Sequence, residues 1–308
     1  MVEIVIEVKD LFKKYGELSA VDGISFEVNG GEVFSILGPN GAGKTTTVEM
    51  MECVRKPTSG SIRIMGHDII GAEKVIKQRI GVIPQDFSTN DLLTVEESIQ
   101  YFADLYDRSV PVDDLIKAVS LEEKRDVYFK KLSGGLKQRV GIAISLVNDP
   151  DIVFLDEPTT GLDPNARREV WDIIQSLKAK GKTVILTTHY MEEAEVLSDR
   201  IAIMNHGRFM AYGTPKEIIE RYGGGSVCVI KGASPAAYEA VSSLDIPCRL
   251  RNGDLIVQAS VRSVLPKVIS ALESSHAPYN ELLVQRSTLE DVFLRLTGRR
   301  IDETEVMA

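Results

Sequence analysis

Short apolar runs alternate with turns over the first 85 or so residues and again after residue 150. Residues 21–28 alternate apolar and polar positions, as a strand with one buried face does. Continuous apolar runs at 33–37 and 152–155 predict strands buried on both faces, which is typical of parallel sheets. Further strands are expected at 183–187 and 201–204. The pattern predicts an α/β core.

The pattern between residues 86 and 148 is helical instead. It opens at Thr94 with Glu97 three positions later, the spacing of a capping box. A later helix is predicted to begin at Asp163-Pro164 and to end at Gly181. A helical insertion therefore interrupts the predicted α/β core.

The glycines at 223–225 indicate a linker over 221–225, which separates a first domain at 1–220 from an accessory domain at 226–308. The order of elements after the linker is βαββαβ, and this order predicts a small ferredoxin-like α+β domain followed by a helix at 288–297. The predicted elements are strand 226–231, helix 234–244, strand 246–251, strand 254–259, helix 262–275 and strand 281–286.

Composition narrows the function classes. The 308 residues are 44% hydrophobic and 26% charged, as in soluble globular proteins. No apolar run approaches the ~18 residues of a membrane span, and acids near the N-terminus do not suit a secretion signal. The net charge of −9 does not favour nucleic-acid binding, so no nucleic-acid partner is expected. We expect a cytoplasmic protein.

Residues 38–45 have the form G-x-x-x-x-G-K-[ST], which builds a phosphate-binding loop. A predicted strand precedes this segment and a helix follows it, which argues against an ordinary glycine-rich turn with a surface lysine. Lys44 is expected to reach the β- and γ-phosphates, and the Thr45 hydroxyl is expected to bind Mg²⁺. The predicted nucleotide-binding residues of the loop are Gly38, Pro39, Asn40, Gly41, Ala42, Gly43, Lys44, Thr45 and Thr46.

Two carboxylates, Asp156 and Glu157, follow the apolar strand at 152–155. Asp156 is placed to hold Mg²⁺ through water, since an acid at the end of a strand beside a phosphate site serves this purpose. Glu157 could orient and deprotonate the attacking water, as a general base does. The alternative is a solvated acidic turn, which the neighbouring phosphate loop disfavours.

Residues 132–139 read Leu-Ser-Gly-Gly-Leu-Lys-Gln-Arg, and with this segment the chain resembles the ATP-binding cassette (ABC) proteins. The resemblance implies that Ser133, Gly134 and Gly135 cap the γ-phosphate of an ATP bound by a second subunit, again at a helix start. Leu136 stands where the family often has glutamine, and a leucine side chain has no polar atom for a contact at that position. A hydrophobic residue there is familiar among exporter cassettes.

Four more positions match motifs of the same family, in the family's order. Gln85 matches the glutamine that touches Mg²⁺ and links the core to the insertion. His189 matches the histidine that contacts the γ-phosphate, and residues 161–163 match the loop along the dimer interface. Tyr15 matches the aromatic residue that stacks on adenine, although an edge-strand tyrosine is the rival interpretation. The other histidines, at 67, 206 and 276, are expected on the surface.

The resemblance covers residues 3 to about 220. It implies a P-loop NTPase cassette with a RecA-like core, an antiparallel β subdomain and a helical insertion. It also implies an ATPase that uses ATP and Mg²⁺, pairs head to tail with a second ATPase subunit, and drives an integral membrane subunit from the inner face of the cell membrane. Residues 287–298 look like the closing helix of cassettes that serve drug, polysaccharide and lipid exporters.

Two other function classes stay open. One is a soluble ABC ATPase regulated by a ligand at its C-terminal domain. The other is an ABC ATPase that acts on a macromolecule other than a transporter. Family members that act on ribosomes usually carry two cassettes, and those that act on chromosomes carry a long coiled coil between phosphate loop and signature. Fewer than one hundred residues separate Lys44 from Ser133, which leaves no room for such a coil.

Overall fold

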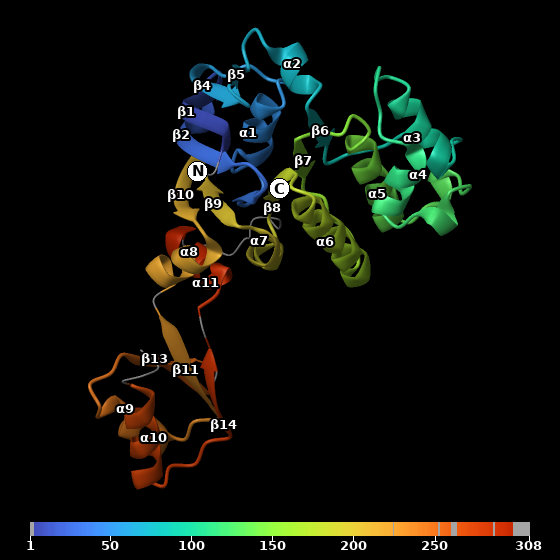
Figure 1. Cartoon of the computed structure of the whole chain (residues 1–308). Helices are drawn as coiled ribbons and strands as arrows, with labels where there is room; N and C mark the ends of the chain where they lie inside the picture. The colour runs from blue at the N-terminus through green and yellow to red at the C-terminus, as the bar shows by residue number, and fades with distance from the viewer. Residues whose placement is uncertain (1–2, 224, 252, 260–263, 286, 298–308) are drawn as a thin grey trace. The chain divides into compact units, whose positions relative to one another are not determined.

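The computed structural model describes residues 3–223, 225–251, 253–259, 264–285 and 287–297. The chain divides after Pro215 into two compact units. Figure 1 follows the elements from blue at the N-terminus to red at the C-terminus. Two sheets belong to the first unit and one sheet to the second. Gly224 of the expected linker lies outside the described residues.

A six-stranded sheet with the order β10-β9-β3-β8-β7-β6 forms the centre of the first unit. Its strands run parallel to their neighbours except β10, which pairs antiparallel with β9. The α/β core predicted from the apolar runs is confirmed. The strands are β3 (Val33–Leu37), β6 (Ile80–Ile83), β7 (Ile152–Asp156), β8 (Thr183–Thr188), β9 (Arg200–Asn205) and β10 (Arg208–Gly213).

Both faces of this sheet are covered, which explains the unbroken apolar runs. Along β7, Val153 and Leu155 join one core with the helices, whereas Ile152 and Phe154 join a second core on the opposite face. Alternate side chains of a strand point to opposite faces, so a strand buried on both sides needs apolar residues at every position. The carboxyl end of β7 therefore emerges from a rigid support.

The second core lies between the central sheet and a four-stranded antiparallel sheet with the order β2-β1-β4-β5. Phe26 from this sheet stacks on Phe34 of β3, with ring centroids 5.3 Å apart. The predicted antiparallel subdomain is present. Its strands are β1 (Ile4–Tyr15), β2 (Leu18–Asn29), β4 (Ser59–Ile64) and β5 (His67–Asp68), and the helices α1 (Lys44–Met51) and α2 (Glu73–Lys77) belong to the same unit.

The helical insertion lies at the β6 edge of the central sheet (green in Figure 1). The capping box predicted at its start is present, because the Glu97 amide donates to the Thr94 hydroxyl over 3.2 Å and the Thr94 amide donates to the Glu97 carboxylate over 2.8 Å. The insertion comprises α3 (Val95–Ala103), α4 (Val112–Ala118), the 3-10 turns η1 (Glu122–Lys124) and η2 (Phe129–Lys131), and α5 (Gly134–Ser145).

Helix α6 (Pro164–Ala179) starts where the sequence predicts, and α7 (Met191–Leu197) follows β8. The Asp163 side chain caps α6 by accepting from the amides of Asn165 and Ala166, each over 3.0 Å. Helix α6 buries the face that packs on the core. None of the helices in the described part of the chain combines the length and apolar character that a bilayer crossing requires.

The second unit contains the antiparallel sheet β12-β13-β11-β14 and has the predicted βαββαβ order. Strand β12 begins at Cys248, later than the predicted 246, because Pro247 has no N–H to donate to the ladder. Helices α9 and α10 share one apolar core with the sheet. The elements are α8 (Pro215–Tyr222), β11 (Ser226–Lys231), α9 (Pro235–Ser242), β12 (Cys248–Arg251), β13 (Asp254–Ala259), α10 (Leu265–Ser274), β14 (Glu281–Gln285) and α11 (Leu289–Thr297).

Candidate active site

The phosphate loop joins β3 to α1, and its backbone is shaped for an anion. Gly43, the residue before α1, has φ +105°, and a Cβ there would lie 2.3 Å from the Ala20 carbonyl oxygen, so only glycine fits. No side chain caps α1. The first amides of any α-helix lack intrahelical partners, and because no side chain caps these, they remain available to a phosphate group.

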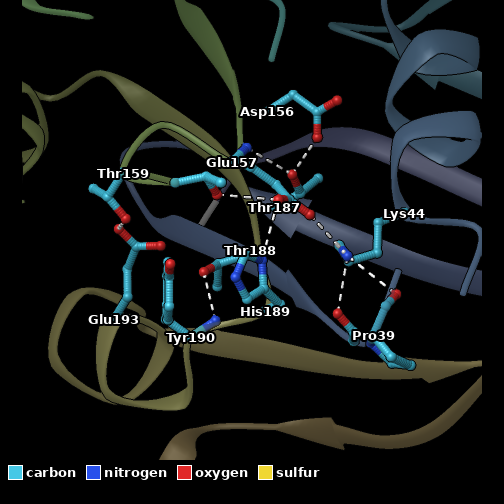
Figure 2. A network of polar contacts seen from close by, with 12 residues as sticks. Pro39, Lys44, Asp156, Glu157, Thr159, Thr187, Thr188, His189, Tyr190 and Glu193 are labelled. Carbon is cyan, nitrogen blue, oxygen red and sulfur yellow. Dashed lines mark hydrogen bonds and ion pairs between the residues drawn. The ribbon is translucent and has the colours of Figure 1, made fainter. Parts of the chain in front are cut away.

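Lys44 lies at the first position of α1 and is 4% exposed. Its Nζ donates to the carbonyl oxygens of Gly38 over 2.9 Å and Pro39 over 3.2 Å. The same Nζ lies 3.0 Å from Oε1 of Glu157. A dashed line marks this ion pair in Figure 2. The phosphate-loop lysine and the second carboxylate after β7 thus form a buried ion pair.

The other carboxylate oxygen of Glu157 lies 3.1 Å from His189 Nδ1 and accepts from the Thr160 hydroxyl over 3.1 Å. An ionised carboxylate only accepts, so this contact places a proton on Nδ1. Burial alone would raise the pKa of Glu157, but the hydrogen bond from His189 and the positive charge of Lys44 outweigh burial and lower it to about 2. Glu157 is therefore a fully ionised acid held between two nitrogen donors.

Asp156 stands at the end of β7, opposite Thr187 in the β7–β8 ladder. The Thr187 hydroxyl donates to Asp156 and accepts from the Glu157 amide over 3.0 Å, so one threonine fixes both acidic residues. Burial raises the pKa of Asp156, although hydrogen bonds from Thr187 and Thr45 oppose the rise. Thr45 and Asp156 are far apart in the sequence, and the fold brings their side chains together.

A pocket of about 500 Å³ opens over the phosphate loop. It brings most of the predicted site together, including the exposed Gln85. The Tyr15 ring is 41% exposed at this pocket, with Lys13 Nζ 5.0 Å from the ring centroid. The residues that line the pocket are Tyr15, Leu18, Ser19, Ala20, Asn40, Gly41, Ala42, Gly43, Lys44, Thr45, Thr46, Gln85, Glu157, His206 and Gly207.

Two segments of this pocket were not predicted from the sequence. One is the start of β2, with Ser19 and Ala20, and the other is the β9–β10 turn, with His206 and Gly207. The Gly207 amide donates to the Ala42 carbonyl over 2.9 Å, which ties this turn to the phosphate loop. His206 is exposed, as expected, yet it lines the pocket. No motif marks either segment.

The signature segment does not line this pocket. Ser133 and Gly134 are exposed at the start of α5, where the Ser133 hydroxyl accepts from the Leu136 amide over 3.4 Å. Gly135 is buried against α6, where a Cβ would lie only 2.6 Å from the Ala166 Cβ. Leu136, in place of the family's frequent glutamine, packs against the apolar core.

Comparisons with known proteins identify the family of this chain. The family description "ABC transporter" matches residues 21–160. A protein of Paraburkholderia xenovorans named "Nod factor export ATP-binding protein I" is 40% identical over 312 residues, which cover 98% of this chain and 100% of that protein. A protein of Ralstonia nicotianae with the same name is 39% identical over 304 residues, which cover 96% and 95%.

Solved structures extend the comparison. A structure described as the ATP-binding subunit of an ABC transporter is 30% identical, with a TM-score of 0.63, covering 71% of this chain and 93% of that one. A dimeric ATP-binding cassette in a post-hydrolysis state with ADP and Pi is 28% identical, with a TM-score of 0.61, covering 68% and 98%. The cassette fold and the resemblance drawn from the motifs are confirmed. This chain belongs to the ABC transporter family, as one of its ATP-binding, ATP-hydrolysing proteins.

Proposed function

We propose that this ATPase drives export through a separate integral membrane subunit, and that its site works with Lys44 on the β- and γ-phosphates, Glu157 as general base and His189 on the γ-phosphate. The convergence of Lys44 and His189 on the buried Glu157 carboxylate is the observation that carries the proposal. Tyr15 would stack on adenine at the exposed end of the same pocket.

The Lys44–Glu157 pair suggests how nucleotide would activate the site. Phosphate oxygens compete with the carboxylate for the ammonium group of Lys44. The charge of Lys44 helps to lower the pKa of Glu157 to about 2. If the Lys44 ammonium group paired with phosphate instead, the pKa of Glu157 would rise and the carboxylate would become a better base. Glu157 would then accept a proton from the attacking water.

The residues proposed for Mg²⁺ are Thr45, Gln85 and Asp156. They offer hydroxyl, amide and carboxylate oxygens, which are the ligands that Mg²⁺ prefers. Asp156 fits this role because its carboxylate lies at the end of β7, within hydrogen-bond reach of the Thr45 hydroxyl. The ion would supply positive charge for the developing phosphate charge, while these three side chains would orient it.

The exposed signature supports a head-to-tail dimer. Ser133 and Gly134 present a capped helix start to solvent and lie off the nucleotide pocket of their own chain. We infer that Ser133, Gly134 and Gly135 complete the pocket of a second copy. Dimeric structures of similar cassettes support such pairing.

The names of the relatives support the direction of transport. Proteins about 39% identical to this chain are named ATP-binding proteins of Nod factor export. We infer an exporter, placed at the inner face of the cell membrane by its membrane partner, with residues 1–220 as the cassette and 226–308 as an accessory domain. A ligand-regulated ABC ATPase, or one acting on another macromolecule, is the alternative.

Complementation tests the shared site. A Lys44→Ala chain and a Ser133→Arg chain are each expected to be inactive as homodimers, whereas their heterodimer keeps one intact pocket. Recovery of about half the ATPase activity per dimer supports the proposal. Purified heterodimers without activity contradict head-to-tail sharing.

Copurification from membranes with an integral subunit tests the export function. A cassette that copurifies only with ribosomes or with itself favours the alternative.

A further inference from the structure

Glu193 on α7 is a buried acid that the proposed chemistry does not use. It has no solvent exposure. Its Oε1 accepts from the Thr159 hydroxyl over 2.8 Å and from Trp171 Nε1 over 2.9 Å. Its Oε2 is buried, and no contact to it among the described residues has full hydrogen-bond geometry, although the nearby Thr188 hydroxyl opposes the rise that burial causes in the pKa of Glu193. Figure 2 shows Glu193 beside Thr159, on the side of the site away from Lys44.

Burial of the Glu193 carboxylate costs free energy of folding, which suggests that this side chain has a function. A polar group moved from water into a protein interior costs free energy unless its hydrogen bonds are replaced. Burial raises the pKa of Glu193, and the hydrogen bonds and the charge of Arg167 offset only part of the rise. The neighbours Ala194 and Leu197 show that an apolar residue suits the buried face of α7.

The contacts of Glu193 link the two segments that carry Glu157 and His189. Thr159 follows Glu157 by two residues, and Glu193 follows His189 by four. The segments therefore touch twice, at the His189–Glu157 contact of 3.1 Å and at the Thr159–Glu193 bond of 2.8 Å. Two contacts restrict both the separation and the relative rotation of two segments more than one contact can.

Arg167 on α6 acts on the segment that carries His189. Its guanidinium carbon lies 4.2 Å from the centroid of the Tyr190 ring, whose centroid is 4.1 Å from that of His189. The charge of Arg167 also acts on Glu193. The backbone of Glu157 has φ +48°, a left-handed conformation that the surrounding structure must hold in place.

We propose that Glu193 is a positioning residue, which holds the Glu157 carboxylate and the His189 imidazole at hydrogen-bond distance. This inference rests on the roles proposed above for Glu157 and His189. Glu193 touches no part of the nucleotide pocket. It therefore affects the turnover of bound ATP and leaves the affinity for ATP unchanged.

The test compares kcat and KM for Mg-ATP hydrolysis in the full chain. Glu193→Ala and the near-isosteric Thr159→Val each break the tie between the two segments. We expect kcat to fall about tenfold and KM to stay within about twofold of the wild type. Glu192→Gln is the matched control, because Glu192 is the exposed neighbour on the same helix, and it should leave both constants unchanged.

A double-mutant cycle with His189→Ala separates positioning from general stability. Once the imidazole is absent, Thr159→Val has little left to position, so the two losses should fall short of adding. Fully additive losses, or an unchanged kcat in both Thr159→Val and Glu193→Ala, would overturn the inference. Unchanged hydrolysis in His189→Ala and Glu157→Gln would instead overturn the proposed function. Trp171 is the single tryptophan, so its emission in Thr159→Val and His189→Ala reports whether the surroundings of its Glu193 contact have changed.

Discussion

Lys44 and Glu157 form an ion pair with 3.0 Å between Nζ and Oε1, and the two side chains are only 4% and 5% exposed. A pair so deeply buried is stable only while both partners are present, because either charge alone would be left in a medium of low polarity. The pair therefore links nucleotide binding, catalysis and folding stability.

Replacing Glu157 with glutamine keeps the shape of the side chain and removes its basicity. We expect ATP hydrolysis to fall by about 10²-fold or more, because a general base contributes about that much. Mg-ATP binding should persist, and the ATP-bound protein should accumulate as a dimer in light scattering. Glu122→Gln, at an exposed position of η1, serves as the control. A Glu157→Gln chain that stays monomeric in saturating Mg-ATP argues against the proposed cycle.

Lys44→Ala removes both the phosphate ligand and the partner of Glu157. We expect loss of ATP binding in equilibrium titration. We also expect a loss of about 3 kcal/mol in the free energy of unfolding without nucleotide, the usual result of leaving a buried charge unpaired. Lys117→Ala on α4 removes an exposed lysine and should change neither property. Unchanged hydrolysis in Lys44→Ala would contradict its role.

Another buried acid, Glu52, predicts how the stability of the fold depends on pH. Burial, and then the charges of Asp156 and Glu49, raise the pKa of Glu52 from 4.5 to about 8. A raised pKa means that the folded state holds the proton more tightly than the unfolded state. The contribution of Glu52 to stability is therefore complete below pH 4.5 and is lost as the pH rises toward 8.

Glu52→Gln removes this dependence. We expect the variant to gain on the wild type by up to about 4 kcal/mol in the free energy of unfolding between pH 5 and pH 8. Urea denaturation with EDTA and without nucleotide measures the difference, since a cation beside Asp156 would favour ionised Glu52. Glu17→Gln is a control at an exposed turn. An equal difference at the two pH values contradicts a protonated Glu52.

The local sequence pattern was sufficient to predict the parts of the site whose residues lie within one segment. The phosphate loop, the Thr94 capping box and the Asp163 cap each depend on residues a few positions apart, so their geometry follows from the sequence. The buried strands could be predicted because a strand covered on both faces, such as β7, needs apolar residues at every position. The family's motifs add the prediction that Gln85, Ser133 and His189 serve the same chemistry.

Contacts between distant segments could not be predicted in the same way. Thr187 meets Asp156 only because of the register between β7 and β8. Glu193 stands beside Glu192 in the sequence, and only the packing of α7 on α6 makes one acid buried and the other exposed. The β9–β10 turn with His206 reaches the pocket through the order of strands in the sheet.

The signature glycines are predicted to serve different purposes, which single alanine substitutions can separate. A Cβ at Gly135 would lie 2.6 Å from the Ala166 Cβ, so α5 and α6 must move apart, whereas a Cβ at Gly134 would meet Leu162 at an ordinary 3.5 Å. Overpacking of this kind costs about 1–3 kcal/mol. We expect Gly135→Ala to lower the melting temperature of the nucleotide-free monomer and Gly134→Ala to leave it unchanged. Because Gly134 is exposed at the start of α5, its substitution should instead weaken ATP-dependent dimerisation. Equal melting temperatures for the two variants would mean that α5 does not depend on close approach to α6 at Gly135.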